Sequence, residues 1–151
     1  MTTWTNILRS IADHASTLGL FGEVSIHNDR LDCRAKDADV PAYFRIDLQK
    51  GVVCVSLVTP DRWLNQAIEQ DLVHTGDKMS DLLDEELADL GHTSTTPTIE
   101  HFRSDDKLYT FVSRLGFGAD QAAARKDELI RVLLAYHAVF TPLGDMEGGD
   151  E

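Results

Sequence analysis

Residues 44–58 read FRIDLQKGVVCVSLV, a stretch that predicts two paired strands of a sheet. In the first half, Phe44, Ile46 and Leu48 alternate with polar residues, as in a strand that buries one of its faces. A Lys-Gly pair then supplies a tight turn. The second half, residues 52–58, is β-branched and almost wholly apolar. Such a run is typical of a strand at the centre of a sheet that is covered on both faces.

Before this hairpin, the pattern predicts a helix and a further pair of strands. Apolar residues recur at helical spacing over residues 4–18, with Thr3 or Thr5 available as the N-cap and Gly19 just beyond the end. Residues 21–35 then read as strand, turn, strand, with an Asn-Asp turn in the middle.

After the hairpin, residues 61–90 have the pattern of a broken helix pair, whose second helix is capped by Asp77 and carries acids opposite its apolar side. Residues 98–115 predict a third hairpin, and a last helix runs from Asp120, its expected N-cap, to about Phe140. We therefore expect an α+β fold. It would be a single domain over residues 1–142, an antiparallel sheet with an N-terminal helix, a central helix pair and a C-terminal helix.

The chain is strongly acidic, with a formal net charge of −12 over 151 residues. The acids concentrate in residues 69–90 and in the tail, residues 143–151, which we expect to be disordered. Binding to nucleic acid or to an anionic membrane is disfavoured, because both depend on clustered Lys and Arg. The acidic middle segment has two interpretations. It is either a solvated helix face that aids solubility or a docking face for a basic partner.

The expected compartment is the cytoplasm. No apolar run reaches the roughly 20 residues of a membrane helix, and the first residues lack the pattern of a signal peptide. Cys33 and Cys54 lie in predicted strands; they form no C-x-x-C pair and have no histidines at zinc-ligand spacing. We expect buried free thiols; a disulfide would require that the two strands be neighbours in register.

No motif for nucleotide binding, metal binding or nucleophilic catalysis is present, so we expect no cofactor, no metal and no catalytic residue. His74 lies near Asp71 and Asp77, where it could bind a cation or cap a helix. His92 and His101 bracket a loop. A small-molecule-binding domain or enzyme with a site built from these scattered His and Asp/Glu residues is the alternative function.

The last predicted helix is apolar over much of its circumference, more than one core-facing stripe requires. A helix of this kind usually buries a second surface, which favours a homodimer. The expected partner or dimer surface comprises Val132, Tyr136 and Val139. His137, beside them, is expected at the rim of this interface.

The order of helix, strands, helix pair, strands and helix resembles the type III secretion chaperone-like fold, which also includes the YbjN-like family of sensory transduction regulators. The resemblance covers residues 4–140 as an order of elements, with one strand more before the helix pair than the simplest secretion chaperones have. It implies a small acidic cytoplasmic protein, usually a homodimer, that holds extended segments of a partner protein on apolar surface. The leading hypothesis is therefore a non-enzymatic protein-binding module, dimeric and chaperone-like or regulatory.

Overall fold

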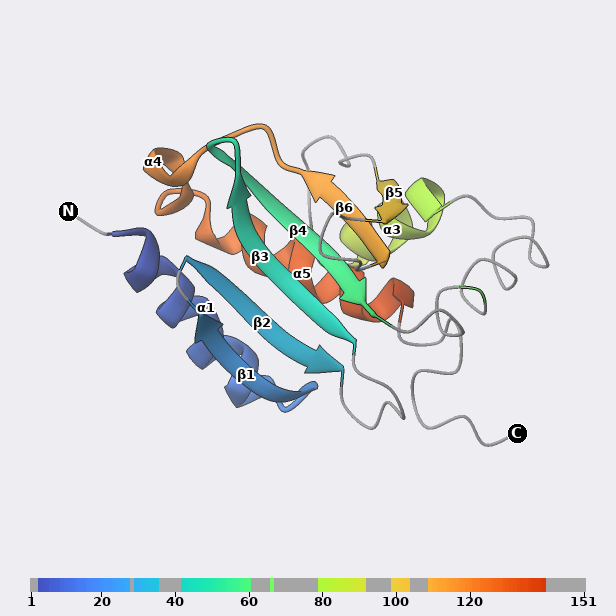
Figure 1. Cartoon of the computed structure of the whole chain (residues 1–151), viewed down its shortest axis with the longest axis horizontal. Helices are drawn as coiled ribbons and strands as arrows, with labels where there is room; N and C mark the ends of the chain where they lie inside the picture. Colours follow the sequence, from blue (N-terminus) through green and yellow to red (C-terminus); the bar gives the residue numbers. More distant parts are fainter. Residues whose placement is uncertain are drawn as a thin grey trace.

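Within the part of the chain that the structure describes, six strands form one antiparallel sheet in the order β1-β2-β3-β4-β6-β5 (Figure 1). The structure is a computed structural model that describes residues 3–27, 29–35, 42–60, 66, 79–91, 99–103 and 109–140. The strands are β1 (Phe21–His27), β2 (Arg30–Ala35), β3 (Tyr43–Gln49), β4 (Val52–Thr59), β5 (Glu100–Arg103) and β6 (Tyr109–Arg114). The α+β class and the antiparallel sheet are thus confirmed.

The described helices are α1 (Trp4–Leu18), α3 (Met79–Asp89), α4 (Ala119–Ala122) and α5 (Lys126–Phe140). The bounds of α1 match the prediction because both of its ends carry specific caps. The Thr3 side chain accepts a hydrogen bond from the Asn6 backbone N–H, and Gly19 adopts the left-handed conformation at the other end. The indole N–H of Trp4 donates to the Asp29 carbonyl at 2.7 Å, which anchors α1 to the β1–β2 hairpin.

The central hairpin of β3 and β4 is also as predicted. Lys50 and Gly51 both have positive φ angles, 53° and 80°, as the central residues of a type I′ turn require. From Val53 to Thr59 every residue of β4 is buried, on both faces of the strand. This burial explains why that segment is apolar along nearly its whole length.

One face of the sheet, here called the inner face, packs against α1 and α5, and α3 packs on α5. The strands lie in front of α5 in the view of Figure 1. Alternate strand residues point to this side and form the core with the helices. The main inner-face residues are Leu31, Cys33, Phe44, Ile46, Val53, Val55, Leu57 and Phe111.

The last helix departs from the prediction at its start. A turn at residues 123–125 separates α4 from α5, and Gly118, not Asp120, is the N-cap of α4. Across this turn the Arg125 backbone N–H bonds to carbonyls of α4, while its guanidinium lies 4.9 Å from the centre of the Phe117 ring. The Ala-rich sequence there contains no helix breaker, so the local pattern did not indicate this interruption.

Several predictions fall on residues outside the described ranges. They are the first helix of the central pair, the start of the second helix at Asp77, and the tail of residues 143–151. Within that first predicted helix only Gln66 is described, and it is helical.

Candidate functional site

The residues of the last helix that were expected to form a dimer surface are buried inside the chain. Val132 and Tyr136 are 0% exposed and Val139 is 4% exposed, and all three belong to the core. The Tyr136 hydroxyl shares a 2.7 Å hydrogen bond with the Ser113 hydroxyl of β6. The assignment of these residues to a partner surface is therefore corrected: they face the chain's own elements.

The physical reason lies in the position of α5 between two layers. One side of the helix packs on β3 and β4, and another side packs on α3, whose Leu83 and Leu87 are buried in the same core. The wide apolar circumference was thus a correct sign of a second buried surface. The partner that covers it is a helix of the same chain.

The histidine candidates are dispersed. His74 and His92 lie outside the described ranges, as does the side chain of His101. His137 is half-buried, with its ring 5.1 Å from the Phe21 ring and 5.8 Å from the Phe44 ring, measured between centres. No group of three metal-ligating side chains occurs among the residues that the structure describes.

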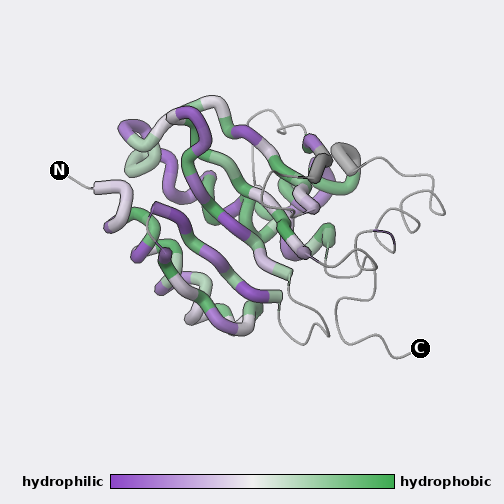
Figure 2. Tube along the Cα trace, in the orientation of Figure 1, coloured by the Kyte–Doolittle hydropathy of each residue, from purple (hydrophilic) through white to green (hydrophobic). Residues whose placement is uncertain are grey.

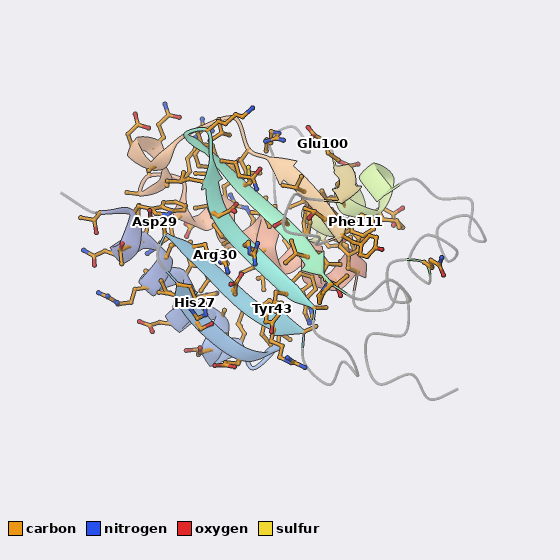
Figure 3. All side chains as sticks on the ribbon, in the orientation of Figure 1. His27, Asp29, Arg30, Tyr43, Glu100 and Phe111 are labelled. Carbon is orange, nitrogen blue, oxygen red and sulfur yellow. The ribbon has the colours of Figure 1, made fainter. Side chains whose placement is uncertain are left out.

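The sheet face opposite the helices, here called the outer face, has a different character. Side chains that alternate with the core residues point to it, and on β2 and β3 they are polar or charged. Figure 2 shows this pattern as hydrophilic colour recurring along β2 and β3, beside the more hydrophobic β4. Figure 3, in the same orientation, labels Arg30 and Tyr43 on these strands. The outer-face positions of β2 and β3 are therefore polar or charged along both strands.

An aspartate between two arginines forms the centre of this part of the outer face. Asp32 of β2 is 5% exposed and stands opposite Arg45 of β3. Its carboxylate accepts a 2.7 Å hydrogen bond from Arg45 Nε and a 3.1 Å hydrogen bond from Arg30 Nε. The shared carboxylate holds the two guanidinium groups in place, as charge-assisted hydrogen bonds of this kind are strong and directional.

A third arginine extends this group. Arg34 stands opposite Tyr43 in the β2–β3 register, and its guanidinium carbon lies 6.0 Å from the centre of the Tyr43 ring. Arg34 forms no ion pair with any described residue. We call Arg30, Arg34 and Arg45, with Asp32 and Tyr43, the arginine cluster. It carries three positive charges against one negative charge, and the Asp47 carboxylate, two residues beyond Arg45 on β3 and close to both Arg30 and Arg45, adds a second negative charge at its edge. A local positive surplus remains, in a chain whose formal net charge is −12.

Next to the cluster lies a hydroxyl with an unusual environment. Ser56 of β4 stands opposite Arg45 and is 1% exposed. Among the described residues its Oγ has no hydrogen-bond partner. A buried hydroxyl without a partner costs on the order of 1–3 kcal/mol, so its place beside the arginine cluster requires an explanation.

The end of the outer face near the β3–β4 turn is electrostatically more balanced. Arg114 of β6 contacts the Glu100 carboxylate at 3.3 Å and the Gln49 amide oxygen at 3.5 Å. Gln49 also donates to Asp47, and burial raises the pKa of the Asp47 carboxyl despite this hydrogen bond. Burial also raises the pKa of the neighbouring Cys54 thiol, to about 11. An anion would therefore meet a better environment at the arginine cluster than here.

On β1, a Ser25 hydroxyl and His27 Nε2 lie 2.9 Å apart. A serine nucleophile needs its histidine oriented by a third group, usually a carboxylate. No carboxylate of a described residue hydrogen-bonds to His27. Ser25 and His27 are two residues apart on the same strand and their contact is exposed, so the arrangement is that of a local surface contact.

Sequence reasoning missed the arginine cluster. The signal was present, because Arg30, Asp32 and Arg34 alternate with apolar residues, and Arg45 does the same on the next strand. What the pattern did not show is the β2–β3 register, which places Arg45 opposite Asp32. The net charge of −12 also gives no indication of a local surplus of positive charge.

Comparisons with protein-family models, with curated proteins and with solved structures give no significant match to this chain. Within the part of the chain that is described, no helix has the length and apolar character required to cross a membrane.

Proposed function

We propose that the protein is a non-enzymatic binding module that recognises an acidic segment of a partner protein with its arginine cluster. The observation that carries this proposal is the charge of the cluster. Three arginines lie with Asp32 and the neighbouring Asp47 on β2 and β3, on the sheet face opposite α1 and α5. The Arg30 side chain is the more open of the two that hold Asp32, 43% exposed against 12% for Arg45. Partners that match a charged patch of this kind are selected by complementary charge.

The geometry suits binding because the guanidinium groups are already positioned. Asp32 engages Arg30 and Arg45 through their Nε atoms. The terminal amino groups of a guanidinium are further donors that fit a carboxylate. Since these side chains lose little freedom on binding, less of the interaction energy is offset by ordering them.

The proposal keeps one expectation from the resemblance and changes another. A protein that holds an extended segment of a partner remains the best description. The contact surface differs, because Val132, Tyr136 and Val139 are buried within one chain. Charge on the outer face, and not an apolar groove on α5, therefore supports the binding role. Dimerisation through those three residues is no part of this proposal.

Fluorescence anisotropy with labelled peptides tests the proposal directly. A Glu-rich peptide should bind more tightly than its Lys-rich counterpart, and binding should weaken as salt is raised. The double variant Arg30→Ala, Arg34→Ala should weaken binding of the acidic peptide roughly tenfold, since each exposed or half-buried charge pair contributes up to about 1 kcal/mol.

The control is Arg9→Ala, which removes one positive charge from the exposed side of α1 and is compared with each of the single variants Arg30→Ala and Arg34→Ala. This variant should bind like the parent protein. Equal affinity for the acidic and basic peptides, or equal losses in the Arg9 variant and the cluster variant, would refute the role of the arginine cluster.

A further inference from the structure

We infer that the acidic segment binds in an extended conformation and carries its acidic side chains at every second residue. This inference rests on the proposed function and specifies the partner for the same surface. It follows from the spacing of the three arginines along β2 and β3.

The arginines occupy successive positions on the outer face. Arg30 and Arg34 lie on β2 on either side of Asp32, and Arg45 is opposite Asp32 on β3. A strand advances about 3.3 Å per residue, so same-face positions follow at about 6.6 Å. Along the strand direction the order is therefore Arg30, Arg45, Arg34, with one arginine at each step of about 6.6 Å.

An extended peptide has the same repeat. Its side chains at i, i+2 and i+4 point to one side and are also about 6.6 Å apart. Three acidic residues at these positions would each face one arginine of the cluster. Acidic residues at i, i+4 and i+8 of a helix offer a similar rise, but like charges at this spacing destabilise a helix. The outer face of β2 and β3 also lacks the apolar groove into which a helix usually packs.

Ser56 makes the central position the most selective. This residue lies opposite Arg45, is 1% exposed and has an Oγ without a partner among the described residues. Side chains directly opposite on neighbouring strands have Cβ atoms about 5 Å apart. The Ser56 Oγ is closed to solvent, so a carboxylate bound at Arg45 reaches it only when the side chains beside it move aside, and it then offers the acceptor that this hydroxyl lacks.

A nucleic acid strand is the other polymer with regularly spaced negative charges. Its high charge density is repelled by a protein of net charge −12 more strongly than a short peptide is. We therefore assign the cluster to an acidic peptide, and an oligothymidylate serves as a competing probe in the test.

The experiment compares three labelled peptides of identical composition, each with three Glu residues in a Ser/Gly background. The Glu residues stand at i, i+2 and i+4, at i, i+4 and i+8, or in one contiguous block. We expect the alternating peptide to bind roughly tenfold more tightly than the other two. The Ser56→Ala variant should reduce this preference and lose about threefold in affinity for the alternating peptide.

A double-mutant cycle identifies the central contact. Replacing the middle Glu of the alternating peptide with Gln should remove the effect of Ser56→Ala, and replacing the first Glu should leave the effect intact. Because an unpaired hydroxyl is removed, Ser56→Ala should not impair folding, which circular dichroism verifies.

The outcomes separate this inference from the proposed function. Equal affinities of the three acidic peptides refute the alternating spacing and leave the proposed function standing. If none of the acidic peptides binds, both are wrong. Both are also wrong if the oligothymidylate binds and the peptides do not.

Discussion

The hydrogen bond between Ser113 and Tyr136 allows a quantitative test of the core. Both residues are 0% exposed, and their hydroxyl oxygens lie 2.7 Å apart. Tyr136→Phe leaves the Ser113 hydroxyl buried without this partner, and we expect a loss of about 1–2 kcal/mol in the free energy of unfolding. Ser113→Ala leaves the Tyr136 hydroxyl unpaired in the core and should cost about 1–3 kcal/mol.

The double variant should cost less than the sum of the two single variants, because it removes both polar groups together. We expect a coupling energy of at least about 1 kcal/mol. Urea unfolding followed by circular dichroism measures all four proteins, and an unchanged slope would show that the unfolded state is not altered. Tyr43→Phe is the control, since Tyr43 is half-buried and its hydroxyl forms no hydrogen bond with a described residue, and it should stay within about 0.5 kcal/mol of the parent.

Two results would refute the reasoning. Strictly additive effects would mean that the two hydroxyls do not interact. A Tyr136→Phe variant with unchanged stability but altered oligomeric state would return Tyr136 to a partner surface.

Three further predictions concern buried groups. Val132→Glu should prevent folding rather than give a folded monomer, because the charge would enter the core; a native circular dichroism spectrum for this variant would contradict the burial of Val132. Asp47→Asn should stabilise the protein at pH 7, since burial raises the pKa of the Asp47 carboxyl above its ordinary 3.8. Folding then favours the protonated carboxyl, so its contribution to the free energy of unfolding is present below pH 3.8 and is lost as the pH rises through the raised pKa. The stability advantage of the Asn variant in urea unfolding should therefore disappear in acid, and a less stable Asn variant at pH 7 would contradict this. Burial raises the pKa of the Cys33 and Cys54 thiols to about 12 and about 11, so a thiol reagent at pH 8 should label the native protein slowly and the unfolded protein fast; rapid labelling of either native thiol would show that it is exposed. The same shifts imply that stability falls as the pH rises above 9, where thiols of the unfolded chain ionise first.

Local signals predicted most of the fold. The cap residues of α1, the turn at Lys50 and Gly51, and the alternation in β3 each act over a few residues, so the sequence alone indicates them.

The strand order excludes the disulfide between Cys33 and Cys54 that the sequence left open. β3 lies between β2 and β4, so Cys33 and Cys54 are not on neighbouring strands, and both thiols are free.

Long-range arrangement limited the prediction of the site. The apolar breadth of α5 showed that a second surface is buried, but not that α3 buries it. Likewise, Arg45 and Asp32 are thirteen positions apart along the chain, and only the strand register makes them partners. Residue patterns report the face on which a side chain lies, whereas its partners depend on packing between elements.

The strand order also has a consequence for the synthesis of the protein on the ribosome. β4 pairs with β3 on one side and with β6 on the other, and β6 follows only after the whole of residues 60–108. Until β6 emerges, β4 is an unprotected edge with the run VVCVSLV, which is β-branched and uncharged. The most buried strand of the finished protein is thus the most aggregation-prone strand of the nascent chain. We therefore expect a molecular chaperone to be needed most before β6 is synthesised, while the edge of β4 is still exposed.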